Sequence, residues 1–157
     1  MNRAPFTFAA RPPSEVEWED LLVRLEITPR ALRLAVDDAG GDSPGARAVL
    51  QGALGREMWW DHVLPELRAG RPILGQFSLD IERDGSEPDA GAMAEAFARM
   101  RERNFAQVQR RGLGVWDWES PVEGLGATLT AYQVLQYIAC MDGEMLASLR
   151  AAGKGAP

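Results

Sequence analysis

The chain has 157 residues, 46% of them apolar, and carries a net charge of −6. This length and composition suit one domain with one filled core, and no apolar run reaches the roughly 18 residues of a membrane span. The acidic balance disfavours binding to nucleic acid. The single cysteine, Cys140, excludes an intramolecular disulfide and, with no secretory signal pattern at the start, favours a cytoplasmic location.

Residues 1–13 have no helical pattern, and we expect an irregular arm there. Ser14 and the glutamate three residues later form a capping box at the start of a helix over 14–38. Its apolar stripe consists of Trp18, Leu22, Leu25, Leu32 and Val36. Because this stripe keeps its phase through Pro29, we expect one kinked helix, although Thr28 could instead cap a second one.

A second helix is predicted over 44–69, because Ser43 and Pro44 suit its N-cap and first position and Gly70 suits its end. The expected core face of this helix comprises Leu50, Ala53, Glu57, Trp60 and Leu64.

Three consecutive large residues, Met58, Trp59 and Trp60, spread over ~200° of the surface of this helix. One core face cannot bury all three, and Trp59 is the one left over. We therefore expect a homodimer through helix faces, with Trp59 in the contact. The alternative is that the connection over 71–88 covers Trp59 within one chain.

We expect a long connection over residues 71–88. Phe77, Leu79 and Ile81 alternate with other residues, so part of the connection could be extended, but it is too short and isolated to build a sheet. Asp89 opens a third helix that ends at Gly112. Its expected core side comprises Met93, Phe97, Met100, Asn104 and Val108. A loop rich in glycine and proline follows, without a predicted strand pair.

The last helix, over 128–150, has the clearest pattern in the chain. Thr130 with Gln133 forms its capping box, and Gly153 is its expected stop. The apolar face comprises Val134, Ile138, Met141, Met145 and Leu149. Four long helices predict an all-α four-helix bundle that spans residues 1–157 as one domain.

Four stretches of the chain resemble the DinB/YfiT-like superfamily: LLVRLEITPRALRLAV, AVLQGALGREMWW, SPVEGLGATLT and LTAYQVLQYIACMDGEML. This resemblance implies a four-helix bundle with a long connection between the second and third helices, and a dimer. Many members of the superfamily bind a divalent metal through three histidines. Some are induced by stress or damage, and some transfer or cleave groups with the help of small thiols.

The metal ligands that the resemblance implies are absent from this sequence. By position they fall on Gly52, Met141 and Met145. Glycine offers no ligand, and a thioether is a poor partner for zinc or nickel. We therefore expect no cofactor and an apolar, closed core in place of the metal site, with a bound zinc or nickel ion as the alternative.

Glu57 and Asp142 are the candidate acid or base groups. Glu57 lies on an apolar face, so it needs a partner or a raised pKa, and a structural pair with an arginine or a hydroxyl is favoured over catalysis. Asp142 is a candidate only because it lies in the same turn of the last helix as Met141 and Met145, which is weak evidence for acid or base catalysis. Arg56, one turn from Gly52, could hold an anionic ligand, and a surface position is the alternative. Met141 and Met145 could line a ligand pocket or simply fill the core.

The other reactive side chains give weaker signals. His62 is the sole histidine, and its helical phase places it on the surface. Cys140 has no histidine or lysine placed to activate it, so an inert thiol is favoured. The basic run of Arg99, Arg101 and Arg103 is interleaved with acids and predicts a solvated helix face.

Two classes of function remain open. The first is a metal-free protein, linked to stress or damage response, that is non-catalytic or binds a small molecule, without nucleic-acid or membrane partners. The second is a metal- or thiol-dependent transferase or hydrolase on the same scaffold, using Glu57, Asp142 or other non-histidine groups. The absence of the three histidines favours the first class.

Overall fold

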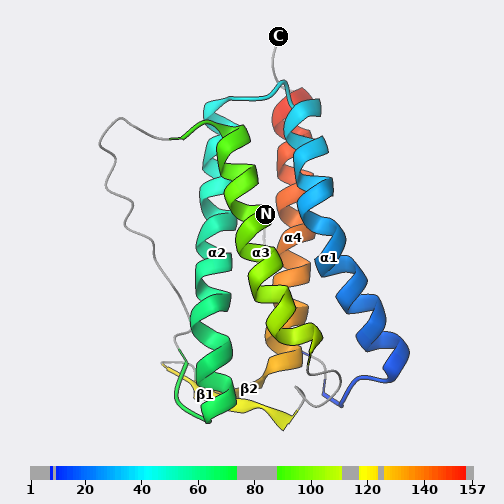
Figure 1. The fold of residues 1–157 in the computed structure, drawn as a ribbon, viewed down its shortest axis with the longest axis vertical. Coiled ribbons are helices and arrows are strands. Elements are labelled where there is room, and N and C mark those ends of the chain that lie inside the picture. Colours follow the sequence, from blue (N-terminus) through cyan, green and yellow to red (C-terminus); the bar gives the residue numbers. More distant parts are fainter. Residues whose placement is uncertain (1–7, 9, 74–87, 111–116, 124–125, 155–157) are drawn as a thin grey trace.

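Four long helices dominate the computed structural model, which describes residues 8, 10–73, 88–110, 117–123 and 126–154 (Figure 1). The helices are α1 (Glu15–Asp38), α2 (Pro44–Ala69), α3 (Ala90–Gln109) and α4 (Ala131–Lys154). Two short strands, β1 (Glu119–Val122) and β2 (Ala127–Thr130), lie between α3 and α4 in sequence. The predicted helical class is therefore confirmed, with a small sheet added.

Each helix begins at the cap expected from the sequence. The side chains of Ser14, Ser43 and Asp89 accept hydrogen bonds from backbone N–H groups of the first turns of α1, α2 and α3. At the start of α4, Gln133 N donates to Thr130 Oγ1 at 3.2 Å and Thr130 N donates to Gln133 Oε1 at 2.9 Å. These caps satisfy donors that have no partner within the helix, so short local motifs fix where the helices start.

Helix ends follow the sequence less closely. Gly70 ends α2 in the left-handed conformation, with φ of 66°, as expected for a residue without a side chain. Gly153 does not stop α4, which continues to Lys154. The stop expected at Gly112 lies outside the described residues. Pro29 lies inside α1, which is one helix rather than two.

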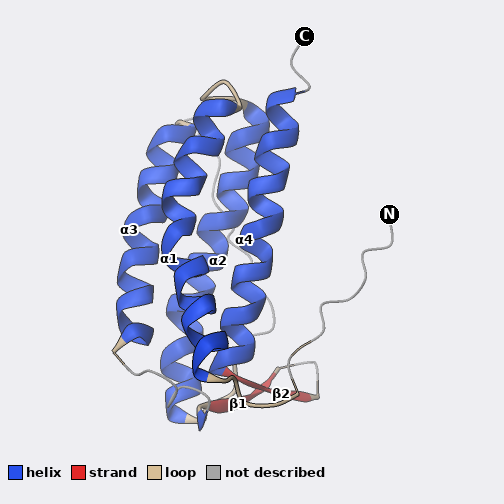
Figure 2. Cartoon of the chain, turned by 90° about the vertical axis from the view of Figure 1, so that its right-hand side faces the viewer, coloured by secondary structure: helices blue, strands red, loops and turns tan. Residues whose placement is uncertain are grey.

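A β-hairpin replaces the strand-free loop that the sequence predicts before the last helix. β1 and β2 pair antiparallel, with Glu119 opposite Thr130 and Val122 opposite Ala127. Ile73 joins them through a bridge to Val122 and is fully buried. Figure 2 shows this hairpin crossing one end of the bundle. The extended part expected at 77–81 lies outside the described residues.

The hairpin escapes a sequence pattern search for physical reasons. Both strands have only four residues, and Pro121, inside β1, usually argues against a strand. Alternate residues of β1, Ser120 and Val122, are nevertheless buried. The hairpin therefore derives its stability from packing against the helices rather than from its own sequence.

The core consists of two apolar clusters stacked along the bundle. One contains the start of α1, the end of α2 and the start of α4, with Trp18, Leu25, Trp60, Leu67, Leu135 and Ile138 among its members. The other contains Leu32, Leu50, Ala53, Phe97, Met145 and Leu149. In every helix, the residues between these two stretches include a buried polar side chain: Thr28, Glu57, Arg101 with Asn104, and Asp142.

Two glycines of α4 provide a matched test of this packing. A Cβ at Gly153 would lie 2.6 Å from the backbone Cα of Ala39, whereas a Cβ at Gly143 would meet nothing within 4 Å. Gly143→Ala is expected to raise the free energy of unfolding by about 0.5–1 kcal/mol, because alanine favours the helix. Gly153→Ala is expected to lower it, because the end of α4 must move away from α1. Thermal melts that shift in the same direction for both variants would contradict this packing.

Candidate functional site at the polar layer of the bundle

A single guanidinium group joins the polar residues between the two clusters. Arg101 is 1% exposed, and Nε and Nη2 donate to Glu57 Oε1 at 3.0 and 2.6 Å. Nη1 and Nη2 donate to Asp142 Oδ2 and Oδ1 at 2.8 and 3.0 Å. Nη1 also donates to the backbone oxygen of Leu25 at 3.0 Å. These five contacts match the five N–H groups that an arginine carries.

Further hydrogen bonds bring α1 and a second residue of α3 into the layer. Asn104 Nδ2 donates to the backbone oxygen of Glu57 at 2.9 Å and lies 3.3 Å from Glu57 Oε2. The hydroxyl of Thr28 lies 2.9 Å from Arg24 O and 3.2 Å from Asp142 Oδ2. All four carboxylate oxygens of the layer therefore have a donor within reach, and all four helices contribute to it.

Aromatic rings enclose the guanidinium. The Arg101 Cζ atom lies 4.8 Å from the centre of the Phe97 ring and 5.2 Å from that of Trp60. Their faces attract a cation and exclude water from the ion pairs. In such surroundings an ion pair is stable only when its remaining donors and acceptors are also satisfied, as they are for Arg101.

The charges of the layer shift the pKa values of its members. Burial acts to lower the pKa of Arg101, but Glu57 and Asp142 outweigh it and raise that pKa above its ordinary value. Burial, together with the charge of Asp142, raises the pKa of Glu57 above its ordinary value of 4.5 and outweighs the opposing effect of Arg101. The folded protein then holds the Glu57 proton more tightly than the unfolded chain. The free energy of unfolding therefore falls as the pH rises from 4.5 through the folded pKa.

The sequence prediction for Arg101 is wrong, while those for Glu57 and Trp60 agree with the structure. We expected Arg101 on a solvated face beside Arg99 and Arg103, yet it lies in the core. The phase contains the missed signal: Arg101 falls four residues after Phe97 and three before Asn104, both on the apolar side of α3. Glu57 is fully buried and paired with an arginine, which is the structural alternative we favoured.

The three positions that the resemblance assigns to metal ligands have different environments. Gly52 is exposed, Met141 is half-buried and Met145 is buried in the second apolar cluster. A Cβ at Gly52 would lie 3.7 Å from Nη1 of Arg56, so a cationic group is the neighbour of this position. The expectation of an apolar, closed place is therefore wrong at Gly52 and Met141, and right at Met145.

A divalent metal does not fit these residues. Gly52 has no side chain, the two methionines offer only thioethers, and the guanidinium of Arg56 would repel a cation. Glu57 and Asp142 carry the carboxylates of the polar layer, and Arg101 donates hydrogen bonds to both. Among the described residues, no three histidine, cysteine, aspartate or glutamate side chains are grouped to hold an ion.

Arg56 differs from Arg101 in that two of its nitrogens have no acceptor within the described part of the chain. It is half-buried, and Nε and Nη2 are buried without a hydrogen-bond partner among the described residues. Burial lowers the pKa of Arg56, while the charges of Asp142, Tyr137 and Glu57 act to raise it. Arg56 therefore lies next to the polar layer, within electrostatic reach of α4.

The remaining candidates lie apart from this layer. His62 is exposed, as its phase predicts. Cys140 is half-buried and lines a groove between α1 and α4 together with Tyr132 and Gln136. The expected exposure of Trp59 is wrong: only 8% of it is exposed, and its ring meets Tyr137 edge-on at 6.0 Å between centroids. Met58 is the exposed member of that triplet.

No family model, curated protein or solved structure matches this chain. The resemblance to the DinB/YfiT-like superfamily therefore stays an expectation, as do the single domain and the cytoplasmic location. Within the described residues, no helix is long and apolar enough to cross a membrane. The absence of nucleic-acid binding stays a prediction from the net charge of −6.

Two arginines of α3 test the polar layer. Arg101→Ala is expected to lower the free energy of unfolding by about 3–5 kcal/mol, because it leaves two buried carboxylates without a counter-charge. Arg103→Ala is the matched control: Arg103 lies two residues away, is 60% exposed and pairs with Asp61 at 3.3 Å. Its loss should change stability little, because solvent screens such pairs. Urea denaturation that gives equal losses for both variants would contradict the central position of Arg101.

Proposed function

We propose that this chain is a metal-free, non-catalytic helical bundle that binds a small molecule. One observation supports the first half of this proposal: Arg101 holds both carboxylates of the polar layer. A general base must be free to accept a proton from a substrate, and a metal ligand must offer its oxygens to the ion. Three of the four oxygens of Glu57 and Asp142 instead accept hydrogen bonds from the Arg101 guanidinium, and the fourth accepts from Asn104.

The alternative function is a transferase or hydrolase that uses Glu57 or Asp142. It requires Arg101 to leave its two partners so that a substrate can reach them. Because Arg101 is enclosed by Phe97 and Trp60 and bonded to the backbone of Leu25, that movement would break five hydrogen bonds at once. This cost favours a structural role for the carboxylates. The link to stress or damage response rests on the resemblance alone.

Metal analysis tests the proposal directly. Protein purified without a histidine tag is expected to contain no stoichiometric zinc or nickel. Adding either ion should leave the melting temperature unchanged, because a ligand that binds the native state raises it. One tightly bound transition-metal ion per chain would refute the proposal and favour the metal-dependent alternative.

We further propose a homodimer, now through α1 instead of Trp59. Val16, Val23, Ile27 and Leu34 are 74%, 52%, 56% and 58% exposed. Their spacing of seven, four and seven residues places them within roughly 40° of one another on α1. Such a narrow apolar line is typical of helix pairing, whereas isolated exposed side chains need no explanation.

The pattern suits a second copy in antiparallel orientation. When Val16 faces Leu34 of the other copy, Val23 faces Ile27, so every apolar residue meets another one. The exposed residues Glu19 and Arg30 lie on the same flank of this line and, in that register, come within one residue of each other across the pair. Opposite charges then meet twice, which favours this register and orientation.

Ile27→Glu is expected to convert a dimer into a monomer, because it places a charge next to Val23 of the other copy. Light scattering at micromolar concentration measures the mass. The control is Met58→Glu on α2, where a 36% exposed residue lies away from the line and the dimer should persist. A monomeric unmodified protein, or a dimer that survives Ile27→Glu, would exclude this interface.

A further inference from the structure

A pair of buried donors on Arg56 has no acceptor in the described part of the chain. Nε and Nη2 are the atoms concerned, and they form one edge of the guanidinium plane. Arg56 is the only cationic side chain of the described residues that has buried donors without an acceptor. A buried donor without a partner destabilises the folded state, so such a pair calls for an explanation.

Other arginines of this chain show what that edge binds. Arg71 uses Nε and Nη2 to hold the two oxygens of Glu66 at 2.6 and 2.7 Å. Arg47 holds both oxygens of Asp42 in the same way, and Arg101 directs the same two atoms at Glu57. The edge matches the spacing of the two oxygens of a carboxylate, and such charged pairs are stronger than neutral hydrogen bonds.

The carboxylates nearest to Arg56 are already engaged. Asp142 offers both oxygens to Arg101, and Glu57 offers one to Arg101 and the other to Asn104. Their charges act to raise the pKa of Arg56, but neither carboxylate accepts a hydrogen bond from Nε or Nη2. The missing acceptor therefore has to come from a group other than these two.

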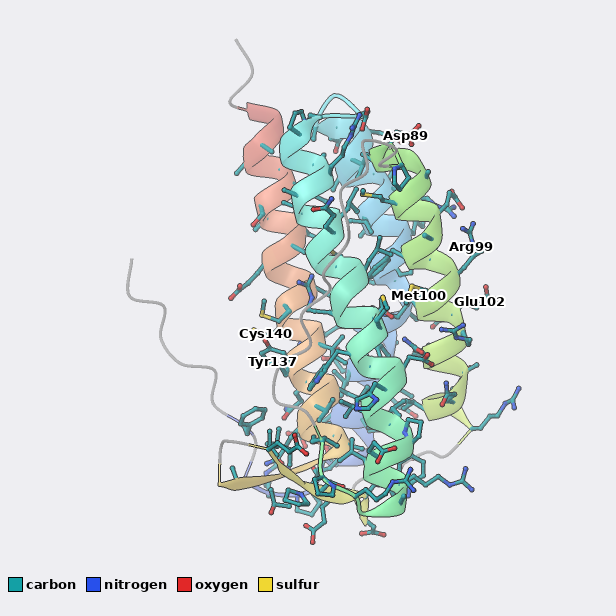
Figure 3. The ribbon with its side chains drawn as sticks, turned by 90° about the vertical axis from the view of Figure 1, so that its left-hand side faces the viewer. Asp89, Arg99, Met100, Glu102, Tyr137 and Cys140 are labelled. Atoms are coloured by element: carbon teal, nitrogen blue, oxygen red, sulfur yellow. The ribbon has the colours of Figure 1, made fainter. Side chains whose placement is uncertain are left out.

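Residue 52, one turn before Arg56 on α2, is an exposed glycine. The guanidinium lies back along α2, with Nη1 3.7 Å from where a Cβ at Gly52 would be. Helix α4 packs against α2 and carries Tyr137. The charge of Tyr137 acts to raise the pKa of Arg56, so the two side chains are near each other. Figure 3 shows Tyr137 on α4 where that helix runs beside α2. A larger side chain at 52 would occupy the volume next to the guanidinium.

We propose that Arg56 binds the carboxylate group of a small molecule through Nε and Nη2. This inference rests on the ligand-binding half of the proposed function and names its ligand class. The carboxylate would supply the acceptor that this buried edge lacks among the described residues. Binding at this position leaves the contacts of Arg101 with Glu57 and Asp142 intact.

The test follows the Arg56 Nε–H signal in proton–nitrogen NMR spectra while sodium acetate is added at constant ionic strength. A saturable shift of this signal is expected with acetate and not with sodium chloride. Arg56→Lys keeps the positive charge but loses the paired donors, and it should weaken acetate binding by about tenfold or more, as measured on neighbouring backbone signals. Arg68→Lys, an exposed position on the same helix, is the control and should bind as the unmodified protein does.

The possible outcomes separate this inference from the proposed function. An Arg56 signal that does not respond to acetate, or equal binding by Arg56→Lys, would overturn the carboxylate site. A response to inorganic phosphate without one to acetate would also overturn it, since the site would then suit a tetrahedral anion. Metal analysis of the same sample tests the metal-free function separately, because a bound ion would refute that function whatever acetate does. Melting curves confirm that each variant is folded.

Discussion

The contact of Arg101 with Glu57 and Asp142 is the constraint on which the rest of the structure depends. It ties α2, α3 and α4 at their centres, and the bond to Leu25 O adds α1. A buried ion pair contributes little net stability when compared with apolar packing, but losing one member is costly. Each of the five N–H groups of Arg101 needs an acceptor, and these acceptors come from the other three helices. The position of every helix along the bundle axis is therefore constrained.

The polar layer also explains why the core is divided. The apolar residues on either side form two clusters that can each be packed well on their own. Sliding one helix by a turn would still place apolar side chains against apolar side chains, because they recur every three or four residues along each helix. The same slide would separate Arg101 from its carboxylates. The layer thus supplies the specificity that the apolar residues lack. Its carboxylates are engaged by Arg101 and Asn104, so they do not serve as acceptors for the buried edge of Arg56.

Much of the local structure could be predicted, and the failures have physical causes. Helix starts at Ser14, Ser43, Asp89 and Thr130 were predictable because a cap depends on residues three apart in the chain. The hairpin was not, because four-residue strands acquire their stability from what they pack against. Trp59 was misplaced because the phase of one helix says which side a residue faces, but not that Tyr137 of another helix covers that side.

The candidate site shows the same division. The sequence by itself determined that Glu57 lies on an apolar face and needs a partner, which follows from periodicity and from the cost of burying a charge. It also determined that Gly52, Met141 and Met145, the positions that the resemblance assigns to metal ligands, carry no histidine. Only the tertiary structure decided that the partner is Arg101, that Asp142 shares it and that two nitrogens of Arg56 have no acceptor among the residues that the structure describes. Glu57 and Asp142 lie 85 positions apart in the chain, so their meeting depends on how whole helices pack. An arginine in a basic run has the same local pattern whether it faces water or two buried carboxylates.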